Sequence, residues 1–117
     1  MSERLPRQWR FYIEDMTGFL EKIIAYTEGR DFAGFVADSM VFDATVRNIE
    51  LVGEAATHVP VNVRLENPQI PWRLVIATRN QLIHGYLGID NETLWSIIQH
   101  DVPLLAAELK ALLDCSE

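Results

Sequence analysis

The sequence is poor in cysteine and has no long apolar run, and both shortages exclude whole classes of protein. Cys115 is the single cysteine, so neither a disulfide framework nor a zinc site is expected. No run approaches the ~18 uninterrupted apolar residues of a membrane-spanning helix, and the first residues lack the apolar core of a signal peptide. We therefore expect a cytoplasmic protein.

Basic residues are scarce as well. Ten Lys and Arg against seventeen Asp and Glu give a net charge of −7, which disfavours broad attraction to nucleic acid. Eight of the ten are arginines, and Arg73 and Arg79 fall in a segment that has no acid between Glu66 and Asp90. Any contact with RNA must therefore be local.

Proline and glycine total only eleven, and they concentrate where helices are expected to end. The spacing of apolar residues predicts helices over residues 5–28, 32–57 and 71–84 and from about residue 90 onward, with a connector over 60–71. Gly29 is expected to end the first helix, Asp90 or Asn91 to cap the last, and Pro103 to kink or divide it near Asp101. We expect one all-α domain over residues 1–117, an up-and-down bundle of four to five helices.

The helix predicted over residues 32–57 is apolar on two nearly opposite sides, so it needs two packing partners. Arg47, Glu50 and Glu54 lie together on the flank of one apolar side. We expect them to form a polar network between helices or between subunits. A monomer would leave one of the two sides without a partner.

Arg79 is the main anomaly, because it falls in the middle of the apolar face of the helix over 71–84. An unpaired guanidinium there would be costly, so a carboxylate or an anion must lie close to it. One interpretation is structural: Arg79 pairs with Glu50 or Glu54 and thereby holds two helices of the bundle together. His84 is then an ordinary residue at a helix end.

The other interpretation is chemical. Arg73, Asn80 and His84 share a polar strip of the same helix. Arginine offers a fixed charge and a planar fork for a phosphate, histidine can move protons near neutral pH, and asparagine can orient either. Such a set suffices for attack of a ribose 2′-hydroxyl on its own phosphodiester, and no metal or cofactor is required.

One geometric difficulty stands against the chemical interpretation. Residues five apart on a regular helix point about 140° away from each other, so Arg79 and His84 do not share a face. Either the long Arg79 side chain curls around a loosened last turn near Gly85, or a second subunit completes the site. The two-sided helix over 32–57 agrees with the second option.

At these residues the chain resembles the HepT-like branch of the HEPN superfamily. Arg79 and His84 match the Arg-x4-His motif of the superfamily, and Tyr86 matches the HepT-like extension of that motif. Two further stretches look like the family's own. They are Arg47-Asn48-Ile49-Glu50-Leu51-Val52-Gly53-Glu54-Ala55 and Ile70-Pro71-Trp72-Arg73.

The resemblance implies a homodimer of helical bundles in which the two Arg-x4-His segments meet in a composite cleft for RNA cleavage. Arg79 would bind the scissile phosphate, His84 would act as general base or acid, and Asn80 would hold the geometry. A supporting polar network would be formed by Arg47, Glu50, Glu54 and Arg73. The resemblance thus points to an endoribonuclease toxin of a type VII-like toxin–antitoxin pair.

The resemblance also implies a protein partner, a minimal nucleotidyltransferase antitoxin of the MntA kind that transfers AMP to Tyr86. Position 85 is glycine where the family often carries aspartate, which leaves the Arg79–His84 pair intact. The alternative is a non-catalytic dimeric module that binds nucleotides or serves as the nucleotidyltransferase's interaction partner. From residue type alone, Tyr86 would instead pack under the last helix.

We expect structural positions, and no catalytic role, for the other two histidines and for the tryptophans. His58 and His100 are expected on the surface, because neither has a metal-like spacing to another ligand. The three tryptophans are expected in the core, and they are Trp9, Trp72 and Trp95.

Overall fold

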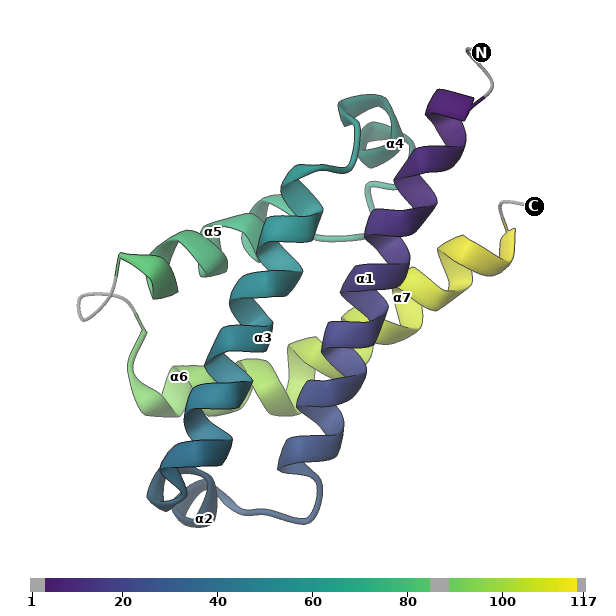
Figure 1. Ribbon diagram of the computed structural model, residues 1–117. Helices are drawn as coiled ribbons and strands as arrows, with labels where there is room; N and C mark the ends of the chain where they lie inside the picture. Colours follow the sequence, from purple (N-terminus) through teal and green to yellow (C-terminus); the bar gives the residue numbers. More distant parts are fainter. Residues whose placement is uncertain (1–3, 85–88, 116–117) are drawn as a thin grey trace.

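The computed structural model describes residues 4–84 and 89–115, with side chains from residue 8 onward, and this part of the chain contains helices but no strand. The helices are α1 (Arg4–Thr27), α2 (Phe32–Ala37), α3 (Ser39–Thr57), α4 (Val61–Glu66), α5 (Trp72–Ile83), α6 (Asn91–Ser96) and α7 (Val102–Cys115), with the π-helical turn η1 (Ile97–Asp101) between the last two. The predicted all-α bundle is confirmed (Figure 1). None of the described helices has both the length and the apolar character needed to cross a bilayer.

α1 is helical because its apolar residues recur three and four positions apart and form one continuous stripe. Ile13, Met16 and Ile23 on this stripe are fully buried. The helix ends at Thr27, and Gly29 follows with a φ of 78°, in the left-handed region that favours glycine. The predicted end of the first helix is confirmed.

The prediction of a single helix over residues 32–57 was wrong, because two helices, α2 and α3, meet at Asp38. Asp38 is in an extended conformation and accepts a hydrogen bond at Oδ1 from the Val41 backbone N–H over 3.2 Å, so it is the N-cap of α3. Arg30 Nη1 holds the same carboxylate at 3.2 Å. A side chain that satisfies the first N–H groups of a new helix competes with helix continuation, and apolar periodicity does not detect this.

α3 lies between α1 and α5, so both of its apolar sides are covered within one chain (Figure 1). The prediction of two packing partners is therefore met by α1 and α5. The inference that one side of this helix calls for a second subunit does not follow from the structure. Among the α3 residues, Met40 near the N-terminal end is the strongly exposed apolar side chain, at 81%.

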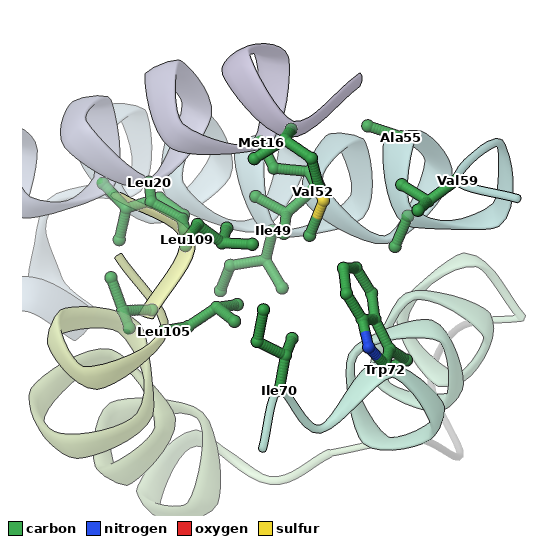
Figure 2. Close-up of a cluster of buried hydrophobic side chains, with 14 of the residues drawn as sticks. Met16, Leu20, Ile49, Val52, Ala55, Val59, Ile70, Trp72, Leu105 and Leu109 are labelled. Carbon is green, nitrogen blue, oxygen red and sulfur yellow. The ribbon is translucent and has the colours of Figure 1, made fainter. Parts of the chain in front are cut away.

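The core fills the space where α1, α3, α5 and α7 converge (Figure 2). Trp72, at the start of α5, is 7% exposed and its indole Nε1 donates a hydrogen bond to the Asn67 carbonyl oxygen over 3.0 Å. Trp9 and Trp95 are half-buried and pack against this core. The expected core position is therefore confirmed for Trp72, whereas Trp9 and Trp95 lie at the edge of the core.

In the second half of the chain, the connector, the helix cap and the helix break lie where the sequence predicts them. The connector before α5 contains only the short helix α4. Asp90 caps α6 by accepting a 2.7 Å hydrogen bond from the Thr93 backbone N–H, and this bond together with one from the Thr93 side chain lowers the pKa of the Asp90 carboxyl. The wide π-turn η1 stands directly before Pro103, at the predicted place.

Replacement of the capping residue Asp38 tests the origin of the break between α2 and α3. Asp38→Ala is expected to lower the free energy of unfolding by about 1 kcal/mol, because the Val41 N–H loses its acceptor. Urea denaturation followed by circular dichroism measures this change. Asp15→Ala, at an exposed position inside α1, is the control and should change stability by less than about 0.5 kcal/mol. Equal effects of the two variants would contradict the capping role.

Candidate functional site

The site begins where α3 and α5 approach most closely, at Gly53 and Arg79. A Cβ atom built on Gly53 would overlap the Cβ of Arg79, come within 2.9 Å of its Cγ and lie 3.1 Å from the Val75 carbonyl oxygen. Only a residue without a side chain lets the two helices meet at this distance. The stem of Arg79 is thus packed against the backbone of α3.

The Arg79 guanidinium is held by two oxygens. Nη2 donates to Glu54 Oε1 over 2.7 Å, and Nη1 donates to Asn80 Oδ1 over 2.7 Å. The side chain remains 29% exposed and that of Glu54 is 47% exposed. The carboxylate predicted from the position of Arg79 is therefore Glu54, and the head group is oriented while part of it still faces solvent. Arg79 Nε is buried and has no acceptor among the described residues.

Glu54 has a second partner that sequence reasoning missed. His58 Nε2 lies 3.3 Å from Glu54 Oε2, and the imidazole stacks on the Tyr12 ring with 5.1 Å between centroids. His58 is exposed, as predicted, but it was not expected to have a role. The available signal was its position four residues after Glu54, which places both side chains on one face of a helix.

The other residues of the predicted network do not join this cluster. Glu50 pairs with Arg47 over 3.2 Å, one turn apart on α3, and its side chain is 17% exposed. Arg73 stands near the start of α5 and is exposed. It lines a shallow groove of about 970 Å³ between α4 and α5, together with Arg64 and Asn80. Two separate charged groups therefore involve α3: the Arg47–Glu50 pair, and Glu54 with its partners Arg79 and His58. The groove between α4 and α5 bears two further arginines.

His84 stands at the C-terminal cap of α5, where its backbone N–H donates to the Asn80 carbonyl oxygen over 3.1 Å. Its side chain is exposed. Within residues 4–84 and 89–115, no hydrogen bond, ion pair or ring contact involves its imidazole, and none joins it to Arg79. The chain by itself does not bring these two side chains together. Gly85 and Tyr86, the AMP acceptor that the resemblance implies, lie outside the described residues.

No group of three or more His, Cys, Asp or Glu side chains in the described ranges is placed to hold a metal ion. The chemically useful groups of this region are thus a fixed guanidinium, an amide beside it and an exposed imidazole at the end of the same helix. A fixed cation can hold a phosphate, and an imidazole can transfer a proton.

Comparison with known proteins identifies the family. The model of the family described as "HepT-like: Ribonuclease HepT-like" matches residues 16–112, which is most of the chain. The chain belongs to this family. It is therefore a HepT-like protein of the HEPN superfamily, as the Arg-x4-His-x-Tyr motif indicates.

Curated relatives match over nearly their whole length. A protein of Thermococcus cleftensis named "Probable ribonuclease HepT" is 32% identical over 108 residues, which is 92% of this chain and 98% of the relative. "Putative RNase MJ1380" of Methanocaldococcus jannaschii is 32% identical over 104 residues, covering 89% of this chain and 95% of the relative. "Putative RNase TTE0752" of Caldanaerobacter subterraneus is 32% identical over 104 residues, with 89% and 93% covered. No solved structure matches the chain significantly.

The close approach at Gly53 generates a stability prediction. Gly53→Ala is expected to lower the free energy of unfolding by roughly 1–3 kcal/mol, because the added methyl overlaps the Arg79 stem and α5 must shift. Urea denaturation measures the loss.

The matched control is Gly18→Ala in α1, where a Cβ atom meets nothing within 4 Å. That change should stabilise the protein by roughly 0.5–1 kcal/mol, since alanine favours the helix. If both glycine variants gain stability alike, α3 and α5 do not approach each other as described.

Proposed function

We propose that this HepT-like protein is a metal-independent endoribonuclease and acts as the toxin of a type VII-like toxin–antitoxin pair. The observation that carries the proposal is the Arg79 guanidinium, fixed by Glu54 and Asn80 at 2.7 Å each yet still partly exposed. The family membership and the ribonuclease names of the relatives support the choice of RNA.

The proposed reaction is attack of a ribose 2′-oxygen on the adjacent phosphorus. His84 as general base takes the 2′-hydroxyl proton, the P–O5′ bond breaks, and the products are a 2′,3′-cyclic phosphate and a 5′-hydroxyl, whose oxygen receives a proton from a general acid. Arg79 stabilises the negative charge that develops on the phosphoryl oxygens. Asn80 keeps the guanidinium in position.

A homodimer would supply what one chain lacks. Because residues five apart on a regular helix point about 140° away from each other, Arg79 and His84 of one chain do not share a face. A second subunit would bring a second imidazole, so that one His84 serves as base and the other as acid. α5 also has much accessible surface that a second subunit could bury, because Trp72 and Thr78 are the only buried residues within this helix. We place the cleft between the α5 helices of two subunits.

The proposed regulation is transfer of AMP from ATP to the Tyr86 oxygen by a minimal nucleotidyltransferase antitoxin of the MntA kind. The phenolic oxygen attacks the α-phosphorus, pyrophosphate leaves and the phenolic proton is lost. An adenylate two residues from His84 would place a bulky anion where RNA binds. The support for this step is the Arg-x4-His-x-Tyr motif, and the pair would act in the cytoplasm.

A second candidate function is a non-catalytic dimeric module that binds nucleotides or only engages the nucleotidyltransferase. The groove between α4 and α5 favours it, since two arginines, Arg64 and Arg73, line an opening suited to phosphates. Calorimetry with nucleotides, together with a cleavage assay, separates the nuclease from the nucleotide-binding form of the module, because that form retains nucleotide without cleaving RNA.

Cleavage of structured RNA in EDTA by the purified protein tests the nuclease. His84→Ala is expected to lower the rate of cleavage by about 10²-fold or more, because the proton transfer is lost. His100→Ala removes another exposed histidine, on η1, and should leave the rate unchanged. The proposal fails if the wild type and His84→Ala give the same low cleavage.

Mass spectrometry after incubation with ATP and the antitoxin tests the regulation. The wild-type chain should gain the mass of one AMP on the peptide that contains Tyr86, and cleavage should fall in parallel. Tyr86→Phe should gain none, whereas Tyr26→Phe, which alters a half-buried tyrosine of α1, should be labelled like the wild type. Label on Tyr86→Phe would assign the acceptor elsewhere.

A further inference from the structure

A second hollow opens between α5 and α7, on the other side of Pro71 and Leu74 from the groove that Arg73 and Asn80 line; these two residues line both. Its volume is about 170 Å³, and its walls are mostly apolar side chains from α1, α3, α5, η1 and α7. Apolar cavities of about 150 Å³ are large enough to bind benzene. Leu74 of α5 and Leu104 of α7 stand at this hollow and are 56% and 60% exposed, so apolar surface extends outward from it.

Glu108 of α7 makes this hollow unusual. Its Oε1 atom is buried, and no donor reaches it among the described residues. A buried carboxylate oxygen without a hydrogen-bond donor is costly, and the cost is removed when a cation binds it. Asp101, seven residues earlier, also lines the hollow and takes part in no ion pair in the described part of the chain.

Among the side chains that the structure describes, no Lys, Arg or His lines the hollow beside these carboxylates. The other polar side chains of the lining are Gln69 and Thr78. The Thr78 hydroxyl is already engaged, since it donates to the Leu74 carbonyl oxygen over 2.8 Å. The hollow therefore combines an apolar body with a carboxylate end that has no cation beside it among the described residues.

We propose that this hollow binds a linear aliphatic amine, with its ammonium group on Glu108 and its hydrocarbon chain among the apolar side chains. The lining from α5 includes Val75 and Thr78, and Thr78 immediately precedes Arg79. A bound amine would fill the space between α5 and α7 and hold α5 more firmly against the bundle. Occupancy would thereby stabilise the helix that carries Arg79 and His84.

Titration calorimetry of the full chain with n-hexylammonium tests the proposal, with n-hexanol and n-hexanoate as matched probes of the same chain length. We expect saturable binding of one n-hexylammonium per chain, at least about tenfold tighter than n-hexanol, because only the ammonium gives Glu108 a charged donor. n-Hexanoate should not bind. Equal affinity for the amine and the alcohol would overturn the role of Glu108 whatever any variant does.

Variants locate the site. Glu108→Gln keeps the shape of the side chain and is expected to weaken n-hexylammonium binding about tenfold, whereas Glu92→Gln, at an exposed position of α6, should not change it. Amide hydrogen exchange across residues 75–79 should slow when the amine binds to the wild type.

Sedimentation equilibrium separates the competing occupant, a basic side chain of a second copy. If Glu108→Gln dissociates a dimer and the wild type binds no amine, the hollow is an interface between copies and the proposal is wrong. An unchanged oligomeric state in Glu108→Gln, together with its loss of amine binding, supports the proposal.

Discussion

The close contact of α5 with α3 at Gly53 is the constraint on which the rest of this structure depends. The missing side chain of Gly53 lets the Arg79 stem lie on the backbone of α3, and this brings the guanidinium within 2.7 Å of Glu54. Because the ion pair is partly exposed, its direct contribution to stability is modest. Its larger effect is on orientation, since a guanidinium bonded through both Nη atoms has little freedom left.

The candidate site has one part that this contact holds in place and another part, the His84 imidazole, that it does not. Arg79, Asn80 and Glu54 are already in mutual contact, and Glu54 also reaches His58. The His84 imidazole, at the end of the same helix, makes no hydrogen bond, ion pair or ring contact in the described part of the chain. A site whose cation is preorganised and whose imidazole still lacks a partner is consistent with assembly between two subunits. The exposure of His84 also agrees with the regulation at Tyr86 that we propose.

The features of this structure that depend on a single local signal could be predicted from the sequence. Gly29, Asp90 and Pro103 marked ends and breaks correctly, and the misplaced charge of Arg79 predicted a carboxylate partner on the neighbouring helix. It failed where two signals compete. The capping by Asp38 overrides the apolar periodicity of residues 32–57, and the second apolar side of α3 is covered by α5 of the same chain. The spacing of apolar residues shows that one side of a helix must be covered, but it does not show whether the same chain or a second subunit covers it.

A double-mutant cycle between Glu54 and Arg79 measures directly whether this ion pair joins α3 to α5. Glu54→Gln removes one charge and Arg79→Met keeps the apolar stem, so the coupling in unfolding free energy isolates the ion pair. We expect a coupling of about 0.5–1 kcal/mol, as for a well-oriented but partly exposed pair. Additive effects, within about 0.3 kcal/mol, would contradict it.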